Sequence, residues 1–351
     1  MGIIGAIALF RFGPSMLFTS NFRTLPRLAL AAACSLGTLP AMAQMFKDSA
    51  LQALHQAERS GELQRVARER LAAQPGDTQA VLALAVAALA ANDAPARQAA
   101  IGRAETCTQE QPQAAVCHYA LGVVLGVQAM TEGMLKAARS AGTEKTALTQ
   151  AQTLDPGWYP ARSALVDFYL LAPVMMGGST SKAAELARGA PTAEQARLLQ
   201  ARVDLQAGKA EAALQALAGL LTANDPELAD SAAQWGMQAG MKLVNDGQAT
   251  KAQPFFERLM RERPGSATGA YGLARVRSET GAHADALKLF DQSATGKGAG
   301  VLPIDYRRGI ALQALGRGDD AKVAYTRFIA AGKGQKPALE DARKRLEQLG
   351  G

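Results

Sequence analysis

Catalytic and metal-binding chemistry depends on histidine, cysteine and acidic residues at short, defined spacings. This chain of 351 residues has only three histidines, His55, His118 and His283, which are too far apart for a metal-ligand motif. It contains no G-x-S-x-G or H-E-x-x-H motif and no dinucleotide-binding glycine pattern. We therefore expect a protein that is not an enzyme and that uses no metal and no cofactor.

One tetrapeptide has the form of a catalytic motif. The run Ser179-Thr180-Ser181-Lys182 matches the S-x-x-K motif of penicillin-binding enzymes. That chemistry also needs motifs similar to S-D-N and K-T-G, and neither is present. Serine is a favoured residue at a helix N-cap and alanines follow Lys182, so we interpret Ser179 as the start of a helix.

Two cysteines, Cys107 and Cys117, remain if a leader containing Cys34 is removed. An even number of cysteines in an exported protein indicates a disulfide, which would stabilise the fold by about 2–3 kcal/mol. A metal site is a poor alternative because the spacing is not C-x-x-C and His118 is the sole nearby candidate ligand. Two buried free thiols are the main alternative to a disulfide.

Residues 1–43 are typical of a secretory signal peptide. Arg23 and Arg27 precede an apolar run over residues 28–39, and small residues follow at positions 41 and 43. We predict cleavage after Ala43, which places the mature protein in the periplasm. The apolar run is shorter than the ~20 residues of a membrane-spanning helix, so we expect no stable membrane insertion.

Two alternatives remain for this leader. Met16 is a candidate true start, because residues 1–15 add a second apolar patch that a signal peptide does not need. Residues 30–34, Leu-Ala-Ala-Ala-Cys, loosely resemble a lipoprotein cleavage box, but the apolar region before Cys34 is very short. A lipoprotein anchored at Cys34 is the minor alternative to soluble export.

The composition indicates close-packed helices. The chain is 48% hydrophobic and only 5% aromatic, and alanine runs such as residues 87–91 are frequent. No segment alternates apolar and polar residues long enough to predict a β-sheet. The formal net charge is +7, but three arginines of this excess lie in the leader. The remaining mixed charge suits solvated helix faces, and we expect no nucleic-acid partner.

The clearest pattern is a repeat between residues 198 and 328. Small residues recur at spacings of 39, 34 and 35, and each is followed by a glycine after seven residues, an alanine after five more and a bulky residue after another four. The small residues are Ala201, Gly240, Ala274 and Gly309, and the glycines are Gly208, Gly247, Gly281 and Gly316. The alanines are Ala213, Ala252, Ala286 and Ala321, and the bulky residues are Leu217, Phe256, Phe290 and Tyr325.

These columns predict pairs of helices. Glycine tolerates the left-handed conformation that ends a helix, so the glycine column ends the first helix of each pair. The small residues lie where the two helices cross, and the bulky residue fills the groove with the next unit. A period of 34 residues in this order, clearest over residues 266–294, resembles the tetratricopeptide repeat. The segment Phe168 to Ser179, with its Gly177-Gly178 pair, resembles exported bacterial members.

The resemblance implies an all-α, right-handed superhelical solenoid of antiparallel helix pairs. After the signal peptide we expect degenerate repeats over 44–113, irregular repeats with insertions over 114–190, four phased repeats over 191–331 and a capping helix over 332–351. In the first of these parts, one helix pair is expected over residues 46–73 with its hinge at Gly61. A second pair is expected over residues 78–107 with its hinge at Asn92-Asp93.

Two insertions, residues 128–142 and 173–178, interrupt the middle repeats. One interpretation is that they are loops that shape a ligand pocket, since long loops concentrate function. The alternative that we favour is inward packing of their methionines, Met130, Met134, Met175 and Met176, because methionine fills irregular gaps.

In tetratricopeptide solenoids the first helix of each pair lines the concave face. For this chain the resemblance implies eight partner-binding candidates, at positions one helical turn before a crossing residue or just after it. Tyrosine and arginine are usual interface anchors, but the same side chains could instead seal helix against helix. The candidates are Tyr119, Leu198, Arg202, Met237, Met241, Tyr271, Arg275 and Tyr306.

These expectations define two function hypotheses. The first is a non-catalytic scaffold of the bacterial cell envelope that binds a peptide or protein segment on its concave face. The second is a periplasmic solute-binding or transporter-accessory protein with a small-molecule pocket near the inserted middle repeats. An enclosed apolar pocket beside the insertions would favour the second hypothesis over the first.

Overall fold

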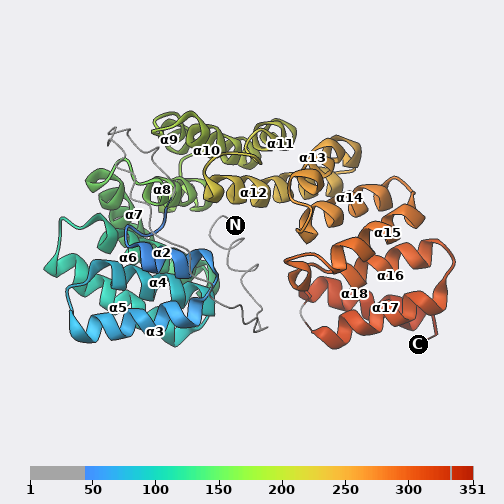
Figure 1. Ribbon diagram of the computed structural model, residues 1–351, viewed down its shortest axis with the longest axis horizontal. Coiled ribbons are helices and arrows are strands. Elements are labelled where there is room, and N and C mark those ends of the chain that lie inside the picture. Colours follow the sequence, from blue (N-terminus) through green and yellow to red (C-terminus); the bar gives the residue numbers. More distant parts are fainter. Residues whose placement is uncertain (1–43, 333, 351) are drawn as a thin grey trace, which may run out of the picture.

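The computed structural model describes residues 44–332 and 334–350. Its regular structure consists of α-helices and two short 3-10 helices, with one isolated β-bridge between Ser266 and Lys297 and no β-strand in the described part of the chain. The helices follow one another along an arc, from α2–α5 through α8–α13 to α16–α18 (Figure 1). The predicted all-α solenoid is confirmed.

From residue 44 onward, the described amino-terminal part contains four helices, and the middle part contains four helices and one 3-10 helix. The first four are α2 (Ser49–Gln56), α3 (Ser60–Ala73), α4 (Thr78–Ala91) and α5 (Ala94–Glu110). The middle elements are α6 (Ala115–Glu132), α7 (Met134–Leu154), α8 (Tyr159–Leu171), η1 (Val174–Met176) and α9 (Thr180–Arg188). None of the helices in the described chain is long and apolar enough to cross a membrane.

The carboxyl-terminal part continues the pairs and ends in a single helix. Its elements are α10 (Ala193–Gln206), α11 (Ala210–Ala218), α12 (Pro226–Asn245), α13 (Ala249–Glu262), α14 (Ala267–Glu279), α15 (His283–Ala294), η2 (Ala299–Val301), α16 (Ile304–Ala314), α17 (Gly318–Ala331) and α18 (Lys336–Gln348). The last helix, α18, packs on α17 and covers a small core around Tyr325 and Phe328 with Leu339 and Leu346.

The repeat columns meet in space as their spacing predicts. The four column glycines adopt positive φ angles, between 72° and 82°, just after the first helices. The ring of Phe256 on α13 lies between two glycines: a Cβ on Gly240 of α12 would lie 2.4 Å from its Cζ, and a Cβ on Gly272 of α14 would lie 2.1 Å from its Cδ1. Phe256 therefore fills the groove between one helix pair and the next.

The first predicted pair is wrong in its hinge. The chain turns at residues 57–59, where Glu58 has a φ of 58°, and Gly61 lies inside α3. The short helix α2 packs on α3 and also reaches the start of α12 through Gln52. The second pair is confirmed: Asn92 ends α4 with a φ of 50°, and the Asp93 side chain accepts a hydrogen bond from the Ala96 amide at the start of α5.

Candidate functional site

The eight predicted concave-face residues lie mostly in the interior. Six of them are at most 9% exposed, and Met237 and Met241 are partly buried against the core. The six are Tyr119, Leu198, Arg202, Tyr271, Arg275 and Tyr306. Their burial agrees with the alternative in which they seal helix against helix, because a side chain without accessible surface cannot contact a partner. Partner binding by any of the eight stays a prediction.

Arg202 shows what these buried polar side chains do. Its guanidinium forms an ion pair with Asp167 of α8, donates a hydrogen bond to Ser163 Oγ at 2.7 Å and lies 4.8 Å from the Trp235 ring centroid. Both members of the ion pair are buried. Removing one partner of such a pair leaves a buried charge uncompensated, so Arg202 holds α8, α10 and α12 together.

Arg275 and Tyr306 also join successive helices. Arg275 Nη2 donates to Asn245 Oδ1 of α12 at 3.1 Å and contacts Glu279 Oε1 at 3.2 Å. The Tyr306 hydroxyl donates to Asp341 Oδ2 of α18 at 2.8 Å. Each bond satisfies a polar group that the packing removes from water, which would otherwise cost about 1–3 kcal/mol.

Part of the inner side of the arc is occupied by the chain's own residues 44–58, called here the N-terminal segment. Figure 1 places α2 of this segment on that side, and α2 packs on α3. The indole Nε1 of Trp158, at the start of α8, donates to the Gln44 carbonyl oxygen at 3.0 Å. The ring of Trp158 packs against Tyr119 with centroids 4.7 Å apart. Trp158 therefore binds the beginning of the segment, and Tyr119 packs against Trp158.

Other contacts hold the backbone and one aromatic side chain of the N-terminal segment. The Oε1 atom of Gln79 on α4 accepts hydrogen bonds from the amides of Lys47 at 3.0 Å and Asp48 at 3.3 Å. Phe46 is only 1% exposed and belongs to the main core cluster. The segment is therefore held by main-chain hydrogen bonds, by the buried side chains of Phe46 and Leu51, and by ion pairs of Lys47 with Asp155 and of Asp48 with Arg70.

Gln52 connects this segment to the centre of the arc. Its Oε1 accepts from the Phe46 amide at 2.9 Å, and its Nε2 donates to Glu227 Oε1 at the start of α12. Burial raises the pKa of the Glu227 carboxyl to about 7, against the lowering effect of the Gln52 hydrogen bond. At neutral pH this carboxyl therefore exchanges between its neutral and charged forms.

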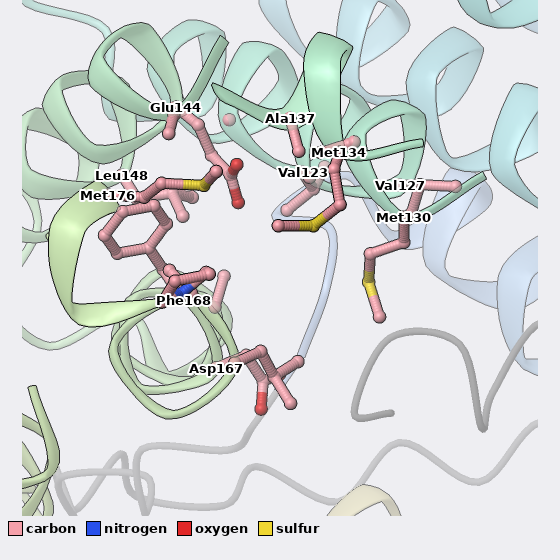
Figure 2. A pocket seen from close by; sticks show the side chains of 18 of the residues that line it. Val123, Val127, Met130, Met134, Ala137, Glu144, Leu148, Asp167, Phe168 and Met176 are labelled. Carbon is pink, nitrogen blue, oxygen red and sulfur yellow. The ribbon is translucent and has the colours of Figure 1, made fainter. Parts of the chain in front are cut away.

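The second candidate site is a pocket beside the insertions. Residues 128–142 are helical and lengthen both α6 and α7, which meet at Gly133 with a φ of 92°. The pocket has a volume of about 370 Å³ and lies between α6, α7, α8 and η1 (Figure 2). Its wall includes Val123 and Val127 of α6, Leu148 of α7 and Phe168 of α8.

Inward packing of the inserted methionines is wrong for three of the four. Met130, Met134 and Met175 are 41%, 65% and 88% exposed, and only Met176 packs against the core. Met130 and Met134 lie near the junction of the two long helices α6 and α7, and Met175 lies in η1. Met130 and Met134 instead line the pocket, which sequence reasoning had held open as the alternative.

A sharp turn at Gly178 closes one side of the pocket. A Cβ on this residue would lie 1.8 Å from the Ala172 carbonyl oxygen, so only glycine fits there. The amide of Gly178 donates to Pro173 O at 3.1 Å, and the amide of Ser179 donates to Tyr169 O at 2.8 Å. The turn holds η1 near α7, where Met176 covers the pocket.

One carboxyl group points into this apolar pocket. Figure 2 shows the Glu144 side chain extending from α7 into the space between Leu148, Met176 and Val123. Its oxygen fits because Gly126 has no side chain: a Cβ there would lie 2.7 Å from Glu144 Oε1. Burial raises the pKa of Glu144 to about 7. Asp167, the other carboxylate of the wall, is already paired with Arg202.

Cys107 and Cys117 lie at the end of α5 and the start of α6. The structure joins their sulfur atoms at 2.04 Å, with the two Cα atoms 5.5 Å apart, in agreement with the predicted pairing. Formation of this bond in the protein stays a prediction, as does the leader that implies export, because residues 1–43 lie outside the described chain. Within the described residues, no group of three or more histidine, cysteine or acidic residues is arranged to hold a metal ion.

No protein-family model and no curated protein sequence matches this chain. Solved structures with similar folds include a tetratricopeptide repeat protein from Parabacteroides merdae, with 14% identity, a TM-score of 0.46, and coverage of 83% of this chain and 99% of that chain. Another is PilF of Pseudomonas aeruginosa, with 13% identity, a TM-score of 0.44, and coverage of 66% and 97%. A third is YrrB, described as a tetratricopeptide repeat protein with an unusual peptide-binding site, with 16% identity, a TM-score of 0.36, and coverage of 61% and 97%.

The chain has a tetratricopeptide-like fold. This statement rests on its own helix pairs and on the glycine and aromatic columns that meet between them. The distant likenesses concern that fold and carry nothing about function.

Sequence reasoning missed the residues that shape both candidate sites. Trp158, Gln79 and Glu227 hold the N-terminal segment, yet they lie outside the repeat columns. Glu144 was not predicted as a site residue either, because a single acidic residue on a long helix is normally exposed to solvent. Its unusual neighbour is Gly126, 18 positions earlier on the antiparallel helix, and nothing in the sequence joins the two.

Proposed function

We propose that this protein is a non-catalytic adaptor of the bacterial cell envelope that binds a segment of another protein on the inner face of its solenoid. The observation that carries the proposal is the N-terminal segment, since a polypeptide of the chain itself already lies on that face. A partner segment of similar character would use the same groups in trans.

The chemistry of this face suits peptide recognition. Trp158 donates to a main-chain carbonyl oxygen, and Gln79 accepts from two successive main-chain amides. These two contacts involve only the backbone of the bound segment and do not depend on side-chain identity. The buried positions of Phe46 and Leu51 select apolar residues, and the ion pairs of Lys47 with Asp155 and of Asp48 with Arg70 favour charged residues between them. The expected partner therefore carries an aromatic or large aliphatic residue within an extended stretch.

Placement in the envelope is supported by the leader over residues 1–43, with its basic start, short apolar run and small residues before Gln44. Under this proposal, signal cleavage after Ala43 would release a new terminus at Gln44, whose carbonyl oxygen is held by Trp158. The same cleavage would therefore create the N-terminal segment.

Site-specific photo-cross-linking tests the proposal. A photoreactive residue is placed at Gln79 on the inner face and, as a control, at the exposed Val323 of α17. The mature chain is then mixed with cell-envelope extract. We expect one dominant adduct from position 79, stronger when Phe46→Ala loosens the N-terminal segment, and none from position 323. Equal adducts at both positions, or none at 79 in either background, would exclude a specific inner-face partner.

A further inference from the structure

The pocket between α6, α7 and α8 combines an apolar wall with a single unpaired carboxyl group. Its volume of about 370 Å³ falls in the range of small-molecule sites, roughly 300–1,000 Å³. Its walls come from α6, α7 and α8 and from the turn that requires glycine at position 178. Its lining residues do not include Trp158, Gln79 or Glu227, which hold the N-terminal segment.

The rim of this pocket is unusually apolar for a protein surface. Eight large hydrophobic residues are exposed in the described chain, and six of them lie at this rim or beside it. The six are Met130, Met134, Leu135, Leu171, Val174 and Met175. Exposed apolar groups gathered in one place mark a binding region rather than ordinary surface. The flexible methionine side chains can adapt to the shape of a ligand.

The charged groups around Glu144 are otherwise engaged or point elsewhere. On α6, Glu132 pairs with Lys136 at 2.5 Å and with Arg97 at 3.7 Å. On α8, Asp167 pairs with Arg202. Among the described residues, none forms a hydrogen bond or an ion pair with the Glu144 carboxyl. The η1 segment contributes no charged residue, and the neighbouring Lys145 lies with its side chain against Gly177.

We propose that this pocket binds a small apolar organic cation, an alkyl or arylalkyl amine, whose ammonium group pairs with Glu144 while its apolar body lies against the methionines and Phe168. A carboxylate in apolar surroundings is poorly solvated. A cation with an apolar body supplies the missing positive charge to this carboxylate and keeps water out of the pocket. A neutral ligand would leave the charge uncompensated, and an anionic ligand would be repelled.

Binding of this kind is linked to protons. Because burial raises the pKa of Glu144 to about 7, part of the carboxyl population is neutral at that pH. The ammonium group favours the ionised carboxylate, so binding releases a proton and becomes tighter as pH rises from 5.5 to 8. The amine itself remains protonated throughout this interval.

The test uses the mature chain with three probes of equal length: n-hexylammonium, 1-hexanol and hexanoate. Titration calorimetry at pH 8 gives affinities, and methyl spectra of ¹³C-labelled methionine show where each probe binds. We expect n-hexylammonium to bind at least tenfold more tightly than the other two and to shift the methyl signals of Met130, Met134 and Met176. Glu144→Gln should remove the preference and bring the three affinities within about threefold.

The matched control is Glu185→Gln, which makes the same charge change on the exposed face of α9 and should leave the preference intact. Thermal melting checks that both variants fold. Three results would overturn the proposal. These are an affinity for 1-hexanol equal to that for n-hexylammonium, an effect of Glu185→Gln equal to that of Glu144→Gln, or a calorimetric heat of binding without shifts of the methionine methyl signals. Protection of Met130 and Met134 by phosphatidylcholine vesicles, with no amine selectivity, would instead assign the rim to a lipid surface. Glu144→Gln should leave the photo-cross-linking at position 79 unchanged. Failure of the amine-binding test would therefore not count against the proposed adaptor function.

Discussion

The side-chain amide of Gln52 links the N-terminal segment to Glu227, a residue 175 positions later in the chain. The same amide accepts the Phe46 main-chain N–H, so one buried glutamine both shapes the segment and attaches it to α12. The inner face of the arc thereby holds a peptide of its own chain through identifiable polar contacts. Those contacts determine what a competing partner must replace.

Loss of the Phe46 ring should release the N-terminal segment while the repeats stay folded. Replacing a buried phenylalanine by alanine costs about 3–5 kcal/mol, and a terminal segment can open separately from the rest of the chain. Hydrogen exchange of Phe46→Ala should accelerate in α2 and leave α12–α17 unchanged. Phe46→Leu, which keeps most of the apolar volume, serves as the control. Acceleration spread evenly over all repeats would show that the segment belongs to the main folding unit.

Glu227 should make the protein less stable as pH rises. Its folded-state pKa is raised to about 7 from the ordinary value of 4.5, so the folded state binds more protons than the unfolded state between these two values. The free energy of unfolding therefore falls as pH increases from 4.5 to 7 and is flat for this group outside that interval. Urea titrations across pH should show a shallower fall for Glu227→Gln. Identical slopes for parent and variant would refute this assignment.

Removing one member of the ion pair between Asp167 and Arg202 should strongly lower the free energy of unfolding. Asp167→Ala leaves the buried guanidinium without its counter-charge, and we expect a loss of about 3–5 kcal/mol in the free energy of unfolding. Asp230→Ala removes a largely exposed partner of Arg263 and should cost less than about 1 kcal/mol. Chemical denaturation of both variants makes the comparison. Similar losses would mean that burial does not decide the strength of these pairs.

The close approach of Phe256 to Gly240 should make that glycine intolerant of any side chain. Gly240→Ala puts a methyl group into the phenyl ring and should destabilise the protein by about 1–3 kcal/mol, although alanine favours helices by about 1 kcal/mol. Adding Phe256→Leu should recover part of the loss, which double-mutant unfolding measurements would detect. Gly102 in α5 has open space around it, so Gly102→Ala should be neutral or stabilising.

The cysteine pair can be examined by counting thiols. In the denatured, unreduced mature chain, a thiol reagent should detect no free cysteine if Cys107 and Cys117 are joined. Reduction should then lower the free energy of unfolding by about 2–3 kcal/mol, as expected for a short closed loop. Two reactive thiols without reduction would establish the free-thiol alternative.

Local and periodic features of this fold could be read from the sequence, and contacts across the arc could not. Gly240 and Phe256 are 16 residues apart in a repeating pattern, so helix geometry alone brings them together. Gln52 and Glu227 belong to no pattern, and only the curvature of the whole solenoid determines that α2 reaches α12. Long-range contacts of this kind leave no periodic trace in a single sequence.

The candidate sites also combine features that the sequence predicts with contacts that it does not predict. The resemblance correctly identified Tyr119 and Arg202 as residues of first helices, but it could not reveal that neighbouring helices bury them. Residues 128–142, predicted as an insertion, form the end of α6 and the start of α7, and the predicted inward packing of Met134 was wrong. Extra helix length adds core only where something lies opposite, and beyond the neighbouring repeats nothing in the described chain covers that residue.

Peptide binding in trans tests the central claim most directly. A fluorescent peptide with the sequence of residues 44–58 is titrated into the mature chain, the Phe46→Ala chain and a Phe46→Ala, Trp158→Phe chain, and anisotropy is recorded. We expect binding to the Phe46→Ala chain, at least tenfold weaker binding to the parent chain, whose inner face is occupied, and weak binding to the double variant, which lacks the indole donor. Equal affinities for all three chains, or no binding to any, would contradict an inner face built to hold a polypeptide segment.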